Sequence, residues 1–484
     1  MPANFLHGVE TIEIDKGPRP IRVVKTAVVG LVGTAPIWEV DPADRKINEP
    51  VLILNERDGA KYFGTMRPGY TIPYALDAIF DHGAGIVIAV NVFDPNVHKT
   101  SVSNVSKTFG TDDKIQLGHI GIVEGSEVVK SVDGLTTYQR NTDYTIDYKT
   151  GVITRLSTGA IPAGATVKID YAYADPSKVQ PSDIIGTTTT DGKRTGMKAL
   201  LDSFNLFGFD PKILIAPGYS TLNSVSSEMI SLAHRLRAIA LIDAPAGATV
   251  QQVIAGRGPN GTINFNTSSE RAVLCYPHLK VYDIATNTER LEPFSQRLAG
   301  VICKTDIEKG YWWSPSNQEL MGIIGTERPI TARINDPNTE ANLLNENGIV
   351  TVFNSFGTGF RVWGNRSAAW PTNTHPKNFI NVRRVADVIH ESIEYAMLQF
   401  IDQPINDALI DAIVESVNAL LRTLVMRGAI IDGKCTFNKE KNPPTEIANG
   451  HLTFDIEFMP PPPAERITFE SFINIELLKK LGGR

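Results

Sequence analysis

A serine beside a glycine gives this sequence its first candidate for catalysis. Gly218-Tyr-Ser220 follows the apolar run Lys212–Ala216 and precedes a predicted helix, which is where a hydrolase nucleophile elbow would lie. That elbow needs a second glycine two residues after the serine, but Leu222 stands there. No histidine in the sequence is identifiable as a base for the serine. We therefore interpret Ser220 as a helix cap rather than a nucleophile.

A glycine-rich segment offers the second candidate, a phosphate site. Gly256-Arg-Gly-Pro-Asn-Gly261 matches the pattern G-x-G-x-x-G. A dinucleotide site needs this motif between a strand and a helix, so that backbone amides point at the phosphate. Here the motif follows a predicted helix and leads into the extended run Thr262–Phe265, which favours a surface turn. The pair Gly30 and Gly33 lacks a third glycine and indicates close packing. We expect no cofactor.

Charged and aromatic groups in the second half supply the remaining candidates. His390 and Glu394 lie four residues apart on a predicted helix, but two ligands are too few for a zinc site, and a solvated or interface face is expected. Arg383-Arg384 near the start of that helix is either a solvated end or pairs with a neighbouring acidic surface. The cluster Gly310-Tyr-Trp-Trp313 predicts core or a subunit interface. The residues therefore predict no catalytic, metal or cofactor site.

The composition limits the function further. The chain has 484 residues, 42% hydrophobic and 21% charged, with 47 Lys and Arg against 53 Asp and Glu and a net charge of −6. This balance lacks the basic footprint of a nucleic-acid-binding protein. Three cysteines far apart predict no disulfide framework and favour synthesis in a reducing compartment. No apolar run approaches the length of a membrane span.

Strand and helix patterns alternate over most of the chain. Thr26–Gly33 and Gly85–Val92 read as buried strands around a helix at Ile72–His82. After Asp183, predicted helices near 196–206, 222–237 and 249–255 alternate with strands at 212–216, 238–243 and 271–275. Such alternation implies a parallel or mixed sheet covered on both faces.

A different pattern interrupts this alternation between about residues 97 and 178. Asp143–Tyr148 and Val152–Thr154 flank a turn that contains Gly151, which is a hairpin signal, and Ala165–Tyr171 is another alternating strand. We interpret the segment as an inserted all-β sandwich or barrel.

The C-terminal region changes pattern again. Two amphipathic helices are predicted at Asn381–Asp402 and Asn406–Arg427, followed by strands at His451–Met459 and Arg466–Ile475. Pro460–Pro463 separates the two strands as a stiff extended segment. Near the other end, Gly8–Ile14 has strand propensity and is closed off by Pro18 and Pro20.

The two detached strands are the most informative feature of the sequence. A strand without a partner pairs readily with a sheet edge of another chain. A chain with one such strand at each end can link two neighbours, and open head-to-tail contacts of this kind build rings and helices. We therefore expect a homo-oligomer.

At this point the sequence resembles the contractile bacteriophage tail sheath proteins. The residues that carry the resemblance run in order along the chain: Gly8–Ile21, Val32–Pro36, Asp191–Gly196, Pro211–Gly218, Gly300–Asp306, Gly310–Trp312, Leu344–Ile349, Phe360–Arg366 and Phe379–Arg384. The inserted β segment is the least characteristic part. The resemblance implies a structural protein and not an enzyme.

The family resemblance also implies an architecture. The expected fold is an α/β core of mixed sheet and helices, an inserted all-β sandwich or barrel domain, an α+β C-terminal domain and extended arms at both ends. The expected segments are an N-terminal exchange arm (1–20), two parts of the α/β sheath domain (21–97 and 179–355), an outward-facing β insert (98–178), an inner tube-facing domain (356–459) and a C-terminal exchange arm (460–484).

The expected function follows from the same resemblance. Subunits of this family stack as hexameric rings around a tail tube, join through exchanged terminal strands and contract to drive the tube through the host envelope for genome ejection. Expected partners are further copies of the chain, the tube protein, and the baseplate and tail terminator proteins, but neither nucleic acid nor a membrane span. The expected location is the virion tail, assembled in the bacterial host cytoplasm.

Two sets of residues carry these expectations. The exchanged strands are assigned to Gly8, Val9, Glu10, Thr11, Ile12, Glu13, Ile14, Arg466, Ile467, Thr468, Phe469, Phe472, Ile473 and Ile475. Possible contacts with the tube are assigned to Arg422, Arg427, Lys434, Lys439 and Lys441. In this interpretation Pro18, Pro20 and Pro460–Pro463 bound the hinges of the arms.

Two alternatives stay open at the level of sequence. One is the sheath of a headless tailocin or a related contractile injection system, which shares the same assembly chemistry. The other is an α/β hydrolase or nucleotide-binding enzyme, supported by the alternation from Asp183 to Cys275 but opposed by the incomplete elbow and the misplaced glycines.

Overall fold

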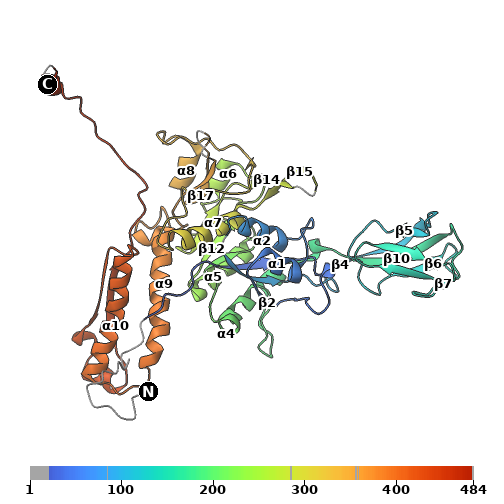
Figure 1. Cartoon of the computed structure of the whole chain (residues 1–484), viewed down its shortest axis with the longest axis horizontal. Helices are drawn as coiled ribbons and strands as arrows, with labels where there is room; N and C mark the ends of the chain where they lie inside the picture. The colour runs from blue at the N-terminus through green and yellow to red at the C-terminus, as the bar shows by residue number, and fades with distance from the viewer. Residues whose placement is uncertain (1–20, 84, 284–285, 355–356, 358, 482–484) are drawn as a thin grey trace, which may run out of the picture.

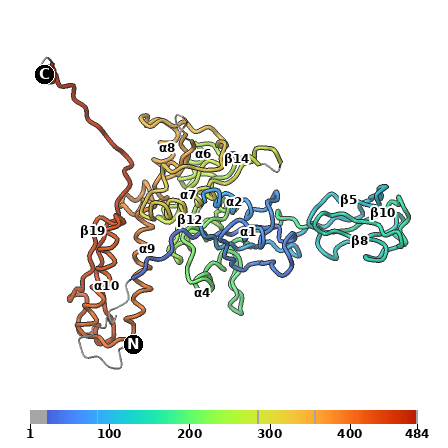
Figure 2. The backbone as a smooth tube through the Cα atoms, viewed as in Figure 1, coloured from blue at the N-terminus to red at the C-terminus, as the bar shows by residue number. Residues whose placement is uncertain are grey.

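The computed structural model describes residues 21–83, 85–283, 286–354, 357 and 359–481. Figure 1 shows a central α/β body, with a β domain extending from one side and a pair of long helices on the other. The C-terminal segment leaves the body near these helices and extends away from it (Figure 2). The mixed α/β character expected from the sequence is therefore confirmed.

A mixed sheet of eight strands forms the centre of the described chain, in the order β18-β17-β13-β12-β11-β1-β3-β2. The inner strands run parallel, and the edge strands β2 and β18 run antiparallel to their neighbours. The inner strands are mostly apolar because helices cover both faces of the sheet. The strands are β1 (Val28–Gly33), β2 (Pro50–Ile53), β3 (Ile86–Asn91), β11 (Ile213–Ile215), β12 (Ile239–Asp243), β13 (Ala272–Cys275), β17 (Ile349–Asn354) and β18 (Phe360–Trp363).

Helices of the central body connect and cover these strands. They are α1 (Glu56–Phe63), α2 (Ile72–Phe80), α3 (Pro181–Ile185), α4 (Ser203–Phe207), α5 (Asn223–Leu236), α6 (Val250–Ala255), α7 (Phe294–Glu308) and α8 (Glu340–Glu346). Local sequence explains the start of α6, where Thr249 and Gln252 form a capping box. The helix predicted near 196–206 is instead a 3₁₀ segment, Gly196–Asp202, that continues into the short α4.

A small antiparallel sheet beside the body has no counterpart in the sequence interpretation. It consists of β14 (Leu279–Asp283), β15 (Thr288–Glu292) and β16 (Gly325–Thr326). Strand β14 buries Leu279 and Val281 in alternation, but it is only five residues long, and β15 and β16 show no apolar alternation.

The β domain consists of two antiparallel sheets, β4-β10-β6-β7 and β5-β9-β8. Their strands are β4 (Lys99–Thr108), β5 (Lys114–Gln116), β6 (Val128–Ser131), β7 (Thr137–Tyr138), β8 (Tyr144–Asp147), β9 (Val152–Arg155) and β10 (Thr166–Ala174). Val129, Ile153 and Ile169 are fully buried in its core. The predicted hairpin around Gly151 is confirmed by the pairing of β8 with β9.

The two connections of the β domain to the body run side by side. The backbone amide of Asp175 donates to the carbonyl of His98 at 3.0 Å, and the Thr100 hydroxyl donates to the Asp175 carboxylate at 2.5 Å. Strands β4 and β10 pair from Lys99 with Ala174 onward. Entry and exit of this domain are thus joined at a single neck.

The C-terminal unit contains α9 (Ile380–Met397), α10 (Asp407–Met426), the short α11 (Pro444–Ala448) and a hairpin of β19 (Asp432–Phe437) with β20 (Phe454–Met459). Asn406 caps α10 by accepting from the Leu409 amide at 2.8 Å. The helix predicted over 381–402 ends earlier, at Met397, and a 3₁₀ turn at Leu398–Phe400 follows. Val385, Ile389 and Leu421 belong to the apolar core of this unit.

Candidate functional site

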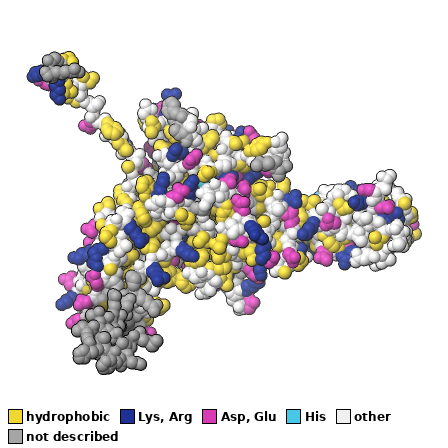
Figure 3. All heavy atoms as spheres, viewed as in Figure 1, with side chains coloured by type: hydrophobic (Ala, Val, Ile, Leu, Met, Phe, Trp, Pro, Cys, Tyr) yellow, Lys and Arg dark blue, Asp and Glu magenta, His cyan; other side chains and the backbone are white. Residues whose placement is uncertain are grey.

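The C-terminal segment beyond the prolines is an exposed strip of large apolar side chains. Phe469 is 89% exposed, Phe472 85% and Ile473 91%. Figure 3 shows apolar side chains along this extension, away from the folded body. A run of exposed apolar residues of this kind marks an interaction site.

The predicted C-terminal strand is extended but unpaired in the single chain. Residues 460–474 have no regular secondary structure, and Ile475–Lys480 forms a 3₁₀ segment. A strand gains its backbone hydrogen bonds only from a neighbouring strand. The exchange of Arg466–Ile475 thus stays a prediction. The other predicted arm, Gly8–Ile14 with Pro18 and Pro20, lies outside the described residues.

The hairpin of β19 and β20 offers a sheet edge on the same unit. The Asn418 side chain of α10 bonds the backbone of Cys435 in β19, accepting from its amide at 2.8 Å and donating to its carbonyl at 3.1 Å. Within the described part of the chain, the outer edge of β20 between Phe454 and Phe458 has no strand partner. An open edge of this kind can accept an added strand.

The N-terminal linker passes the same unit. Ile21, Val23 and Val24 pack on the core shared by α9 and α10, and the Val24 amide donates to the Ser392 hydroxyl at 3.2 Å. Both described ends of the chain therefore leave the fold next to this C-terminal unit.

A stripe of buried ion pairs joins α9 to the central body. Arg384 donates to Asp306 of α7 through two nitrogens, at 2.7 and 2.5 Å. Three residues on, Asp387 accepts two hydrogen bonds from Arg271, at 2.6 and 2.7 Å. Four further on, Glu391 lies 2.5 Å from the Lys212 ammonium. Residues spaced by three and four share one helix face.

These six charged side chains are almost completely shielded from solvent, each at most 7% exposed. Burial raises the pKa of Glu391, an effect that Lys212 opposes. Arg383, next in sequence, donates to Glu270 and Asp387, both at 2.9 Å. The solvated helix end considered for Arg383 and Arg384 is therefore wrong, and their acidic partners lie within the same chain.

The possible tube-contact residues all lie in the C-terminal unit. Arg422 and Arg427 are exposed at the end of α10, and Lys434 is exposed on β19. Lys439 and Lys441 follow in a 3₁₀ turn. Two of the five already have partners, because Arg422 pairs with Glu415 and Lys441 lies 2.5 Å from Asp455. A role of these residues in tube contact stays a prediction.

The serine motif has a structural role that the sequence did not indicate. Ser220 is fully buried and lies before α5, whose first residues receive no side-chain cap. Its hydroxyl donates to the Asp243 carboxylate and accepts from the Asp243 amide, both at 3.1 Å. The prediction of a helix cap is therefore wrong. Ser295 also binds Asp243, by its amide at 2.8 Å and its hydroxyl at 2.5 Å, and burial raises the pKa of Asp243.

The glycine-rich segment forms the predicted turn. The amides of Gly256, Gly258 and Gly261 donate to carbonyls of the same turn and of α6, at 2.9, 2.9 and 3.3 Å. These donors are consequently not free to cradle a phosphate. Close packing at Gly33 is confirmed, because a Cβ there would lie 2.2 Å from the Thr71 hydroxyl.

The histidine and aromatic candidates are also occupied by structural contacts. Glu394 pairs with Arg237, and His390 meets the ring of Phe458 edge-on at 5.7 Å. Of the aromatic cluster, Tyr311 is buried in the core of the C-terminal unit and Trp312 packs against that core, whereas Trp313 is 50% exposed. Within the described ranges, no group of three or more His, Cys, Asp or Glu side chains could hold a metal ion. No helix of those ranges is both long and apolar enough to cross a membrane.

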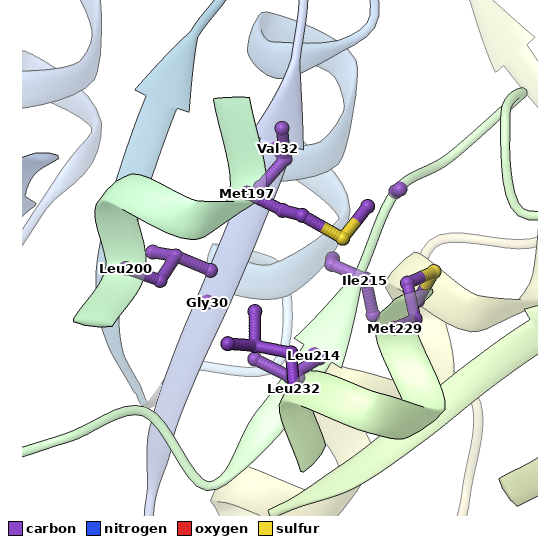
Figure 4. Close-up of a pocket in the computed structure, with 9 residues that line it drawn as sticks. Gly30, Val32, Met197, Leu200, Leu214, Ile215, Met229 and Leu232 are labelled. Carbon is purple, nitrogen blue, oxygen red and sulfur yellow. The ribbon is translucent and has the colours of Figure 1, made fainter. Parts of the chain in front are cut away.

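A small apolar void lies between the sheet and its helices (Figure 4). It is lined by Gly30 and Val32 of β1, Met197 and Leu200 of the 3₁₀ segment, Leu214–Ala216, and Met229 and Leu232 of α5. Its free volume is about 10 Å³, hardly room for one water. The lining is apolar and has no convergent polar groups. It is a packing gap and cannot hold a substrate.

Comparisons with known proteins agree with this arrangement. Residues 192–368 match the model of the phage tail sheath protein central domain, and residues 372–474 match that of the phage tail sheath C-terminal domain. The tail sheath protein of Burkholderia phage BcepMu is 54% identical over 485 residues, covering 100% of both chains. The chain belongs to the phage tail sheath protein family. It is a structural subunit of a contractile tail sheath and a component of the virion tail.

More distant sheath proteins match nearly the whole length of this chain at lower identity. The tail sheath protein of Escherichia phage P2 is 28% identical over 99% of this chain and 98% of its own. Among solved structures, the PVC sheath complex in the contracted state has a TM-score of 0.61 at 14% identity and covers 98% of this chain. The contracted helical sheath of the anti-feeding prophage has a TM-score of 0.60 at 17% identity. The sheath fold therefore persists where little sequence identity remains.

Proposed function

We propose that this sheath subunit polymerises through its terminal arms. Residues 466–475 of one copy add as a strand to the β19–β20 hairpin of another, and Gly8–Ile14 joins the same kind of sheet in a further copy. The subunits then stack as hexameric rings around the tail tube, between the baseplate and the terminator. The sleeve assembles in the host cytoplasm and contracts to drive the tube through the envelope.

The observation that carries this proposal is the exposed apolar C-terminal segment. Ile467 is 70% exposed and Phe469 89% exposed, so neither packs on the body of its own chain. In the described part of the chain, the outer edge of β20 in the C-terminal unit has no strand partner and could accept such a segment from another copy. Each backbone hydrogen bond contributes only about 1 kcal/mol net. Several such bonds at every subunit of a long polymer nevertheless resist separation, while rigid contacts between the bodies change.

Truncation separates the arms from the rest of the molecule. We expect the chain without residues 466–484, and the chain without residues 1–16, to remain folded and monomeric and to form no long sleeves in electron micrographs. As the control, removal of residues 98–178 eliminates a much larger piece but should spare the sleeves. Normal sleeves from either arm deletion would refute strand exchange.

We further propose that segment 356–459 faces the tube and the β insert faces outward. Support comes from the basic side chains Arg427, Lys434 and Lys439, all exposed on one unit. Replacing these three with glutamate should weaken sheath assembly on purified tubes but leave tube-free sleeves unchanged. Equal assembly on tubes by both proteins would place the tube contact elsewhere.

A further inference from the structure

Arg366 holds its guanidinium group in a fixed position between β18 and α9. The group lies over the ring of Trp370 at 3.9 Å and over that of Phe379 at 4.2 Å. Its Nη1 donates to the Asn378 side-chain oxygen at 3.0 Å, and Asn378 is itself buried. Two rings and one hydrogen bond therefore orient the remaining donors, which form a planar fork.

The first acidic residue after the prolines occupies that fork. Nε of Arg366 donates to Glu465 Oε1 at 2.9 Å, and Nη2 donates to the other carboxylate oxygen. Paired contacts of this kind are among the stronger hydrogen bonds and are also directional. The Arg366 side chain is 15% exposed, so the pair is partly shielded from water.

A second contact holds the proline run itself. The side-chain nitrogen Nδ2 of Asn381 donates to the Pro461 carbonyl at 3.1 Å and to the Trp312 carbonyl at 3.0 Å. Pro460 is buried. Residues 460–465 are thereby docked on the start of α9 and on the segment that precedes it.

The contacts change abruptly after Glu465. In the described chain, the hydrogen bonds and ion pair of residues 466–481 join only members of that segment, such as Lys479 with Glu476. All sixteen of these residues are exposed. The boundary between the docked and the free parts therefore lies at Glu465.

We propose that Arg366 is a positioning residue for the C-terminal arm: its fork clamps Glu465, so the arm pivots after Glu465 and not at Pro460–Pro463. The arm's destination on another copy rests on the proposed function. From this fixed origin, the ten residues 466–475 reach at most about 35 Å. The clamp restricts where the free segment searches, which lowers the entropy lost when it pairs with a neighbour.

Site-directed spin labels locate the pivot in the free subunit. Cys275, Cys303 and Cys435 are all buried, so an added cysteine at the exposed position Ala464 or Thr468 can be labelled selectively. A label at 464 should be immobile and one at 468 mobile. Arg366→Gln should release the label at 464 and leave that at 468 unchanged, and Arg366→Lys should release it partly, because lysine keeps the charge but not the fork.

The matched control is Arg194→Gln, which removes an arginine–aspartate pair with Asp202 elsewhere on the body. It should change neither label. Equal mobility at 464 and 468 in the native sequence, or no response of position 464 to Arg366→Gln, would overturn the clamp.

The critical concentration for sleeve formation tests whether Arg366 positions the arm. Arg366→Gln and Glu465→Gln should each raise the critical concentration for sleeve formation about tenfold. The double variant should be no worse than either single one, because all three lack the same contact. An unchanged critical concentration would refute the positioning role. Normal sleeves after deletion of 466–484 would instead refute strand exchange, while the label at 464 still decides the clamp.

Discussion

Helix α9 is held on two faces by different chemistry. One face carries Arg384, Asp387 and Glu391 in buried ion pairs with the central body. The other carries Val385 and Ile389, which pack in the apolar core shared with α10. Apolar contacts tolerate small shifts because they have little direction, whereas bidentate ion pairs require one geometry.

The two faces of α9 therefore have different structural roles in a sheath subunit. The apolar face makes α9, α10 and the hairpin one unit, and the ionic face sets the orientation of that unit on the body. Buried ion pairs contribute little net stability, because desolvation offsets their attraction, but breaking one leaves an uncompensated charge. The comparison can be tested on both faces of the helix.

Loss of one partner on the ionic face should have the largest effect. Arg384→Ala leaves Asp306 buried without its counterion, and we expect the free energy of unfolding to fall by about 4 kcal/mol. Denaturant unfolding of the monomeric chain measures this change. The double variant Arg384→Met, Asp306→Leu removes both charges and should recover much of the loss. A double variant as unstable as the single one would contradict the ionic account.

A truncation on the apolar face should come next. Leu421 of α10 is fully buried in the same core, and Leu421→Ala should lower the free energy of unfolding by about 3 kcal/mol through lost burial and a residual cavity. The exposed Met426→Ala is the control on the same helix, and an equal loss from both would be inconsistent with the assigned core.

Acid should lower the stability of the central body, next to its contact with α9, through His82. Burial lowers the pKa of His82 from 6.5 to about 4, opposed by its hydrogen bond with Ala78. The ring is neutral because it contacts the Ala78 carbonyl at 3.0 Å and accepts from the Met321 amide at 3.3 Å. It packs beneath Gly300 of α7, the helix that carries Asp306.

The sign of the acid effect follows from the lowered pKa. As the pH falls below 6.5, the unfolded chain binds a proton that native His82 does not, so stability is lost. Between pH 7 and pH 5 this costs about 2 kcal/mol. His82→Gln should flatten the unfolding free energy over this interval, and an unchanged slope would assign the acid sensitivity to other groups.

The exposed pair on α10 should have the smallest effect. Arg422 and Glu415 are 59% and 67% exposed, in contrast to the pairs of α9. Arg422→Gln should change the free energy of unfolding by less than about 0.5 kcal/mol, because water screens such pairs. A loss near that of Arg384→Ala would show that burial does not separate the two classes of pair.

Periodicity in the sequence predicted the inner strands β1, β3, β11, β12 and β13, helix α5 and the two long helices closely, because each buries a continuous apolar face. It did not predict the inner strand β17. It predicted α9 with its apolar stripe but not the partners of its charged stripe. Arg384 and Asp306 lie 78 positions apart, and no local pattern links them. The sequence shows charged side chains at a spacing of three and four residues, at 384, 387 and 391, but not that they are buried.

The errors at Ser220 and at Gly196–Asp202 have local causes. Ser220 has a residue type that favours a cap, but α5 begins at Asn223 with Leu222 at the N-cap position, and Asp243 on the next strand takes the Ser220 hydroxyl. The segment after Gly196 is apolar at helical spacing, yet it packs tightly against β1 and β3 and adopts a 3₁₀ conformation. Small strands such as β15 lack apolar alternation altogether, so tertiary pairing alone defines them.

The β domain is a suitable place to insert added sequence, because both of its connections to the body lie side by side. Its connections lie together at His98 and Asp175, and β4 and β10 remain paired along their length. The turn at Asp133–Leu135 has an 86% exposed leucine and follows β6 of the same sheet as β4. With the insert facing outward, as proposed, a peptide grafted into that turn would be displayed at every repeat of the polymer, turning the sleeve into a dense array of epitopes.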